Sequence, residues 1–232
     1  MSTQDDGSAN TGNDTARIET FSDGVFAIAI TLLVLEIQVP QVEDAPEGTS
    51  LLAALVGLWP SYLGYALSFL VIGTMWANHH NRFKLMVRSD HNLILLNTLL
   101  LMCTAFIPFP TALLAGYIQG TEEQQTTAVA SYSGTLAATA VVFTLLWLYA
   151  AHGYRLVDRN LDPALLRAMR RRYVVGMTLY ATAFALAFLN VVFSLALIAG
   201  LALLFVLPEP RSRPGKPEAS AEDDRAPEKS GT

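Results

Sequence analysis

The residue best placed for chemistry in this sequence is Asp23, an ionisable side chain inside an apolar run. It lies in the segment Arg17-Ile-Glu-Thr-Phe21-Ser22-Asp23-Gly24. A charged side chain costs roughly 2.5–3.5 kcal/mol at the centre of a membrane span, and less near an end. Asp23 is therefore expected to have polar partners or water: it could cap this helix, bond a neighbouring helix, or contact a permeating cation.

The residues after Asp23 predict a helix with one apolar face that carries a single hydroxyl. At about 100° per residue, one side of the helix collects Gly24, Ile28, Thr31, Leu32 and Leu35. Asp23 points to nearly the opposite side. Arg17 is about 120° away from Asp23 around the helix, which is poor geometry for a direct pair. Asp23 is therefore expected to find its partner on another helix.

A second polar cluster, Trp76-Ala77-Asn78-His79-His80-Asn81, is the candidate for that partner. We expect an interhelical hydrogen-bond network of Ser22, Asp23, Asn78 and a histidine. Adjacent histidines point about 100° apart on a helix, so His79 and His80 are a weak metal-ligand pair and no metal is expected. A histidine at this position could also make the protein sensitive to pH.

Long apolar stretches must position these residues. The chain of 232 residues is 52% hydrophobic and 15% charged, and its apolar stretches have the length of about 17–25 residues that crosses a bilayer. The fold class predicted is an all-α integral membrane protein with six transmembrane helices per subunit and a homo-oligomeric pore. The channel domain is expected over residues 17–207, with spans at about 21–39, 60–77, 92–109, 131–152, 173–189 and 191–207. Residues 1–16 and 208–232 are polar and are expected to be disordered cytoplasmic tails.

Prolines and polar residues set the expected boundaries. Pro60 should open the second span after a short interfacial helix, because proline is tolerated in a first helical turn. Pro108 and Pro110 should stop the third span, and residues 121–127 should form a polar loop. Asp162 and Pro163 read as a helix start. The last apolar stretch should turn near Asn190, the one strongly polar residue in it.

The distribution of charge supports six spans with both termini in the cytoplasm. With that arrangement, all 15 Lys and Arg residues fall in segments placed inside, around residues 17, 82–88, 155–172 and 211–229. The outer loops hold only acids, namely Glu43, Asp44, Glu47, Glu122 and Glu123. Cytoplasmic loops of membrane proteins favour Lys and Arg in this way.

The sequence has no Gly-rich phosphate loop, metal-binding helix motif or nucleophile elbow, so we expect no enzyme. The carbonyl-filter signature Thr-Val-Gly-Tyr-Gly of ordinary potassium channels is also absent. The motif Arg17-x-x-x-Phe21-Ser22-Asp23, together with residues 24–36 and 76–83, resembles the transmembrane protein 175 family of potassium channels in its short prokaryotic form.

The resemblance implies a homotetramer in which the first span of each subunit lines the pore. It implies a constriction at Ile28, with Leu32 and Leu35 further out, and a selectivity role for Thr31. The remaining motif and network residues would hold the pore helix in place: Arg17, Phe21, Ser22, Asp23, Trp76, Asn78, His79 and His80. The alternative to pore lining is that Ile28, Leu32 and Leu35 are helix-packing residues.

The function expected is passive, potassium-selective flux in the plasma membrane of a prokaryote. The expected partners are further copies of the chain and the lipid bilayer, with no nucleic acid, and the permeant ion K⁺ is expected without a cofactor. Two alternatives stay open. One is a secondary ion transporter that uses Asp23 as its coupling carboxylate, and the other is a non-conducting membrane scaffold.

Overall fold

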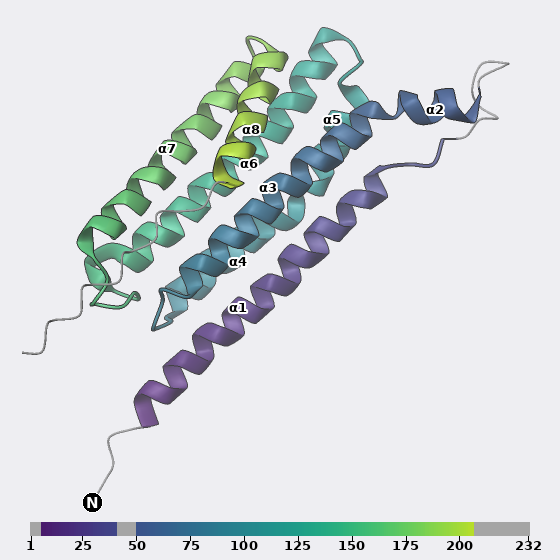
Figure 1. Cartoon of the computed structure of the whole chain (residues 1–232). Coiled ribbons are helices and arrows are strands. Elements are labelled where there is room, and N and C mark those ends of the chain that lie inside the picture. The colour runs from purple at the N-terminus through teal and green to yellow at the C-terminus, as the bar shows by residue number, and fades with distance from the viewer. Residues whose placement is uncertain (1–5, 41–49, 207–232) are drawn as a thin grey trace, which may run out of the picture.

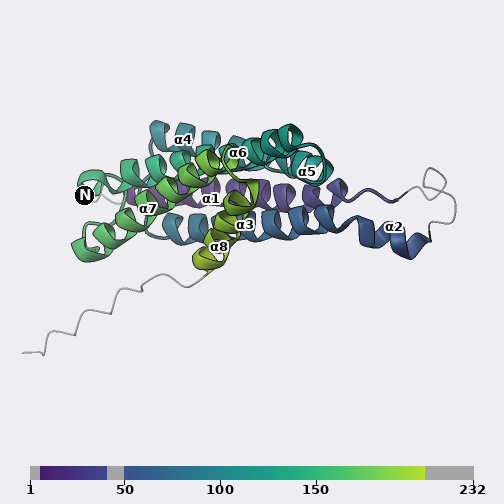
Figure 2. The same cartoon turned by 90° about the horizontal axis from the view of Figure 1, so that it is seen from above.

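The chain folds into an elongated bundle of helices. The structure, a computed structural model, describes residues 6–40 and 50–206. Its elements are α1 (Asp6–Leu32) with a 3-10 turn (Leu33–Glu36), α2 (Leu51–Gly57), α3 (Trp59–Phe83), α4 (His91–Phe106), α5 (Pro108–Tyr117), α6 (Glu122–Ala151), α7 (Pro163–Ala187) and α8 (Val191–Val206). Figure 1 shows α1 along one edge of the bundle and α7 along the other, with α3 and α6 between them. Figure 2 shows α2 projecting beyond one end of the bundle.

Three helical segments of the described chain are long and apolar enough to cross a bilayer. They are Asp14–Glu36, His91–Tyr117 and Glu122–Tyr154. The pair of α2 and α3, bent by 45°, raises the number to four if it counts as one span. The first ten residues of α7 contain four arginines, and α8 has only 16 residues. The expected six spans therefore stay a prediction.

Two expected boundaries at the polar ends of helices are wrong. Helix α1 begins at Asp6, so most of the segment 1–16 is helical where a disordered tail was expected. Helix α6 begins at Glu122, where a polar loop was expected over residues 121–127. The cause is a capping box: the Thr121 hydroxyl accepts a hydrogen bond from the Gln124 N–H, and the Gln124 side chain accepts one from the Thr121 N–H. Such a box satisfies two backbone donors and starts the helix early.

The expected stop at Pro108 and Pro110 is also wrong, because the helical path continues to Tyr117. Ile107 keeps helical backbone angles, and Pro108 occupies the first turn of α5. A proline at that position loses only a donor that a helix start leaves unpaired in any case. The prolines therefore begin a new helix in place of ending the span.

Other local signals lie where the sequence indicated them. Pro60 stands in the first turn of α3, and the short α2 precedes it. The Asp162 carboxylate accepts a hydrogen bond from the Ala164 N–H at 2.7 Å, and Pro163 is the first residue of α7. The chain turns between α7 and α8, where the Asn190 side chain accepts hydrogen bonds from two N–H groups of α8.

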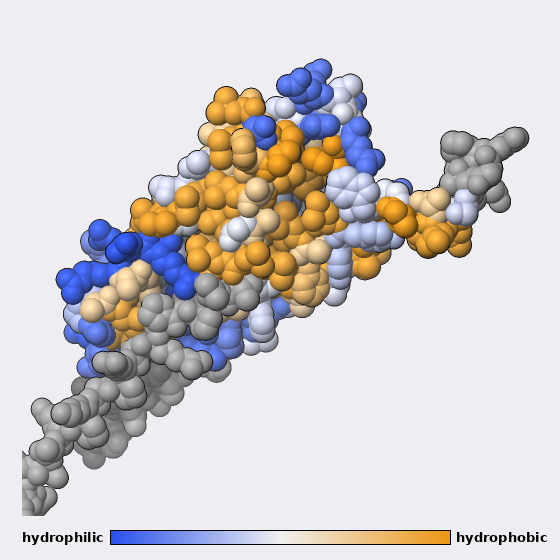
Figure 3. Space-filling model, turned by 45° about the horizontal axis from the view of Figure 1, so that its top comes forward, coloured by the Kyte–Doolittle hydropathy of each residue, from blue (hydrophilic) through white to orange (hydrophobic). Residues whose placement is uncertain are grey.

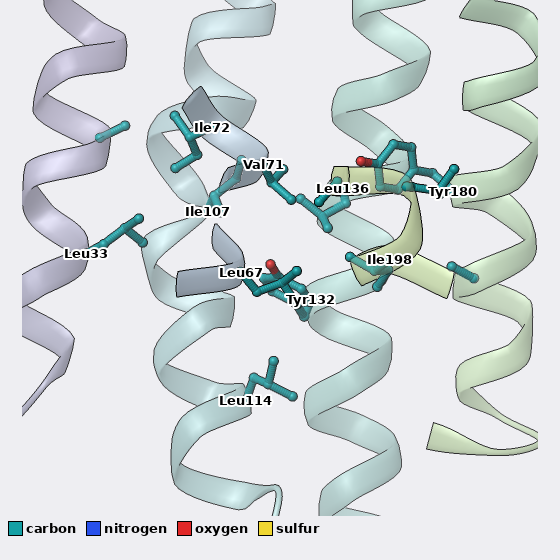
Figure 4. Packing of buried hydrophobic residues seen from close by; sticks show 14 of the residues in the cluster. Leu33, Leu67, Val71, Ile72, Ile107, Leu114, Tyr132, Leu136, Tyr180 and Ile198 are labelled. Atoms are coloured by element: carbon teal, nitrogen blue, oxygen red, sulfur yellow. The ribbon is translucent and has the colours of Figure 1, made fainter. Parts of the chain in front are cut away.

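The core of the bundle joins every long helix. Figure 4 shows Leu33 of the 3-10 turn after α1, Ile72 of α3 and Ile107 facing one another, with Leu136, Tyr180 and Ile198 completing the cluster on the side of α6, α7 and α8. A polar contact is embedded in it: the Ser68 hydroxyl lies 2.7 Å from the Thr111 hydroxyl and 3.0 Å from that of Tyr132. Hydroxyl contacts of this kind hold helices together where water is absent.

One end of the bundle, here called the basic end, comprises the loop 84–90 and the loop 152–162. The Asp90 carboxylate accepts a hydrogen bond from the Tyr149 hydroxyl at 2.6 Å and lies 3.4 Å from Arg155. Arg82 differs from the other cations, because it is buried with its guanidinium over the rings of Trp147 and Tyr173. Figure 3 shows a broad apolar band across one face of the molecule, with hydrophilic residues gathered toward the ends.

Candidate functional site

Helix α1 presents two opposite faces, and only one of them packs against other helices in residues 6–40 and 50–206. Ser22, Phe26, Ala29 and Leu33 recur at spacings of three and four residues and are all buried. This stripe lies against α3 and α4. A helix stripe with this period is the one that faces a core.

No described part of the chain covers the opposite face, here called the bare face. It carries the five residues that the helical wheel predicted to lie together, which are all exposed: Gly24, Ile28, Thr31, Leu32 and Leu35. Ile28 is 60% exposed and Leu35 is 69% exposed. The Thr31 hydroxyl donates a hydrogen bond to the Ile28 carbonyl at 2.9 Å. Its proton is thereby engaged, and the lone pairs of its oxygen are left for another group.

Asp23 binds a neighbouring helix, as the sequence predicted. Its carboxylate accepts a hydrogen bond from the Trp76 indole N–H of α3 at 2.9 Å. Asp23 is partly exposed, and it lies on the side of α1 that faces α3. The contact gives the carboxylate a fixed position beside α3.

A buried relay joins α1, α3 and α4 next to Asp23. The Asn97 amide nitrogen donates to the Ser22 hydroxyl at 2.9 Å, and its oxygen lies 2.9 Å from His79 Nε2. Ser22 in turn donates to the Ile18 carbonyl at 2.8 Å. Asn97 is 2% exposed, so one amide from α4 holds the other two helices together.

The relay differs from the expected network of Ser22, Asp23, Asn78 and a histidine, since Asp23 binds Trp76 separately. Asn78 was expected in it, but its side chain lies on another side of α3 and lines a cavity with α6, α7 and α8. Asn97 takes its place, and sequence reasoning missed it. The only signal was one amide, followed by Thr98, in the mostly apolar run from Leu93 to Met102, and a helical wheel does not say which helix lies opposite.

Aromatic rings fix His79 in place. The His79 imidazole stacks on the Phe83 ring with a centroid distance of 4.3 Å, and the Phe26 ring of α1 lies 5.3 Å away. The histidine therefore has apolar surfaces on both sides and one hydrogen bond at its edge. This confines its orientation toward Asn97.

His80 contacts α1 directly, whereas His79 contacts α4. The His80 Nδ1 atom lies 2.6 Å from a Glu19 carboxylate oxygen, and its ring stacks on Trp76 at 6.0 Å. The two histidines thus turn to different helices, which leaves them no shared ligand position. Glu19, Asp23 and His80 do offer ligand atoms within 4.8 Å of one another. His80 and Trp76 already engage both carboxylates.

Of the residues predicted to hold the pore helix, the structure brings five together and leaves three elsewhere. Ser22, Asp23, Trp76, His79 and His80 meet at the contact of α1 with α3 and α4. Arg17 and Phe21 are exposed and border a cavity between α1 and α4, and Asn78 lies apart from both. A packing role for Arg17 and Phe21 stays a prediction.

Comparison with known proteins places these features in a family. A family model described as endosomal/lysosomal potassium channel TMEM175 matches residues 17–108. A potassium channel of Chamaesiphon minutus is 47% identical over 195 residues, which are 84% of this chain and 95% of that protein. A potassium channel of Streptomyces collinus is 44% identical over 193 residues, which are 83% of this chain and 92% of that protein.

A solved structure agrees with the sequence comparison. The crystal structure of a lysosomal potassium-selective channel TMEM175 homolog from Chamaesiphon minutus superimposes with a TM-score of 0.76 at 45% identity. The match covers 84% of this chain and 97% of that one. The similarity therefore extends over the helical bundle as a whole.

Proposed function

The chain belongs to the TMEM175 family of ion channels, and from this premise we propose that it is a potassium channel whose pore is lined by α1. The proposed assembly is a homotetramer in the plasma membrane of a prokaryote, with both chain termini in the cytoplasm. Two relatives that match over more than four fifths of the chain are named potassium channels, which supports the choice of ion. As a member of a channel family, the chain is not an enzyme.

The observation that carries the proposal is the bare face of α1. A pore needs several lining helices, and α1 is the helix whose exposed face combines a glycine, a hydroxyl and large apolar side chains. Copies related by closed symmetry would supply the other walls. The motif residues on the buried side of the same helix would then fix its rotation, so that Ile28 and Thr31 face the axis.

The chemistry of this face fits a pore without a carbonyl filter. A ring of Ile28 side chains forms an apolar constriction, and such constrictions gate by excluding water. One turn outward, a ring of Thr31 oxygens offers acceptors to a cation, because each hydroxyl proton is held by the Ile28 carbonyl. Leu32 and Leu35 extend the apolar lining beyond it.

A transporter that uses Asp23 is the weaker alternative. A coupling carboxylate must exchange its partner during transport, whereas Asp23 is held by Trp76 on the side of α1 that faces α3. A scaffold role would leave the glycine and hydroxyl of the bare face without a function.

Reconstitution of the purified chain tests the proposal. In planar bilayers with potassium on one side and sodium on the other, a channel gives a current whose reversal potential lies toward the potassium equilibrium potential without a coupled ion. A flux that requires a proton or sodium gradient would favour the transporter. Electrical silence over several voltages and pH values would favour the scaffold.

Accessibility to aqueous reagents tests the pore lining separately. Cys103, the only cysteine, is first replaced by serine, and cysteine is then introduced at Ile28, Thr31 or Leu35. Each of these should react with a charged thiol reagent and reduce the current. Leu99→Cys on α4 is the matched control, since Leu99 is an exposed apolar residue outside α1. Equal protection of all four positions from the reagent would reject α1 as the lining helix.

A further inference from the structure

A small cavity lies inside each subunit, away from α1. It has a volume of about 50 Å³ and is open on one side. Its walls come from α3, α6, α7 and α8, which the two cartoon views place next to one another (Figures 1 and 2). The walls are mostly apolar, with Met75, Phe143, Met177 and Phe205 among them.

One buried polar side chain in the wall of this cavity, Asn78, lacks a hydrogen-bond partner among the described residues. Asn78 is 8% exposed, and within residues 6–40 and 50–206 its amide makes no hydrogen bond. Two other polar side chains of the wall are satisfied by backbone carbonyls: Thr74 donates to Leu70 O at 2.6 Å, and Thr144 donates to Ala140 O at 2.7 Å. Tyr173 and Tyr180 also line the cavity. The Asn78 amide is thus a polar wall group with both donor and acceptor capacity to spare.

An amide left in this state is costly. Removing an amide from water without a hydrogen bond costs roughly 1–3 kcal/mol by protein measurements, and a membrane interior offers no water in return. A leucine would fill the same space without the cost. The position thus has the features of a ligand site: an apolar body with one convergent polar group.

The size and charge of the cavity define what fits it. A water molecule needs about 10–15 Å³ of such space, so 50 Å³ admits a molecule of roughly four or five heavy atoms, with more in the opening. The wall contains no carboxylate, and Tyr173 in it carries the Arg82 guanidinium over its ring at 4.3 Å. A cation is disfavoured there, while an electronegative oxygen is favoured.

We propose that this cavity is a binding site for a small neutral amphiphile, with a hydroxyl or carbonyl oxygen on the Asn78 amide and a short apolar body against the methionines and phenylalanines. Asn78 would both donate to and accept from a hydroxyl. The site lies in one subunit and does not depend on the channel proposal.

Photolabelling of the purified, reconstituted full chain tests the proposal. The probe is a four-carbon alcohol that carries a diazirine, and 1-butanol serves as competitor. We expect saturable labelling of cavity residues such as Met75, Tyr173 and Met177, located by peptide mass spectrometry and displaced by 1-butanol. The corresponding alkyl diazirine without the hydroxyl should label these residues at least several-fold less.

Two variants test separately the contributions of the Asn78 amide and of the cavity volume to binding. Asn78→Leu should reduce apparent affinity about tenfold, which corresponds to about 1.4 kcal/mol. It should fold at least as well as the wild type, because it removes an unsatisfied polar group. Thr74→Leu fills the cavity and keeps the amide, so it should also abolish saturable labelling. The matched control is Asn81→Leu, which alters an exposed amide three residues further along α3 and should leave labelling unchanged.

Three results would overturn the proposal. The first is labelling that does not saturate, and the second is equal labelling by the alcohol and its hydrocarbon analogue. The third is unchanged labelling in Asn78→Leu. Because the readout is covalent labelling, a chain that conducts no ions would still give a valid answer.

Discussion

The Asn97 relay makes a quantitative prediction. In Asn97→Leu, a side chain of similar size loses its hydrogen bonds to Ser22 and to His79, both 2.9 Å long. Interhelical hydrogen bonds in membranes are worth about 0.6 kcal/mol each on average, so the two together contribute about 1.2 kcal/mol. His79 is buried, and leaving its ring nitrogen unsatisfied adds roughly 1–3 kcal/mol. We therefore expect Asn97→Leu to lower the free energy of unfolding by about 2–4 kcal/mol.

Ser22→Ala should cost less, because Ser22 also bonds to the carbonyl of Ile18 within its own helix. Its expected cost is about 0.5–1 kcal/mol. The double variant should cost less than the sum by at least about 0.5 kcal/mol, since both changes break the same bond.

Reversible unfolding in mixed micelles, titrated with SDS, measures these values. Thr98→Val is the matched control, because Thr98 is exposed on α4 and bonds only to Ile94 of its own helix. It should change stability by less than about 0.5 kcal/mol. The reasoning fails if Asn97→Leu is as stable as Thr98→Val, or if the costs of Asn97→Leu and Ser22→Ala add without coupling.

The other predictions concern the pore, its anchor and the basic end. Ile28→Asn should wet the constriction and raise single-channel conductance or relax ion preference in bilayer recordings; an unchanged channel would contradict an Ile28 constriction. Thr31→Val keeps the side-chain shape and should lower the potassium-to-sodium permeability ratio, measured from reversal potentials, whereas an unaltered ratio would remove Thr31 from selectivity. Asp23→Ala and Trp76→Phe break one hydrogen bond and should each reduce the yield of assembled protein in gel filtration without changing the selectivity of what assembles. A loss of selectivity alone would show that Asp23 acts on the ion. Burial raises the pKa of Asp90, but hydrogen bonds from Tyr149 and the Leu93 N–H, together with Arg155, hold that pKa below 3.8. Its stabilising contribution is thus present above about pH 4 and lost as pH falls through the lower folded pKa. Thermal unfolding should show a smaller acid-side loss in Asp90→Asn, and equal acid losses in both proteins would count against the Asp90 contacts.

The pattern of exposure along α1 was predictable because it depends on the geometry of one helix. Gly24, Ile28, Thr31, Leu32 and Leu35 share a face by spacing alone, and the structure finds all of them exposed. Local stop and start signals were also readable: Asp162 with Pro163, and Asn190 in its apolar surroundings, act through the backbone within a few residues.

Apart from the contact of Asp23 with Trp76, the contacts between helices were not predictable from the same information. Asn97 meets Ser22 across 75 residues of chain and His79 across 18, and no local pattern encodes such a meeting. Asn78 and His79 differ by one position in sequence but by about 100° around α3, which is enough to send them to different neighbours. The capping box of Thr121 and Gln124, in contrast, is a local pattern that can be recognised in a sequence. It was overlooked because the polar composition of the segment indicated a loop.

The anchoring of α1 has a mechanical consequence. Glu19, Ser22 and Asp23 link α1 to α3 and α4 by polar contacts, whereas the buried side chains of the following turns, Phe26, Ala29 and Leu33, make apolar contacts, which carry no directional preference. The helix is thus a lever with its fulcrum near Asp23. At 1.5 Å per residue, Ile28 lies about 8 Å from the fulcrum and Leu35 about 18 Å, so a tilt of about 5° shifts them by about 0.7 Å and 1.6 Å. In the proposed pore, the same tilt would therefore widen the end at Leu35 more than twice as much as the ring at Ile28.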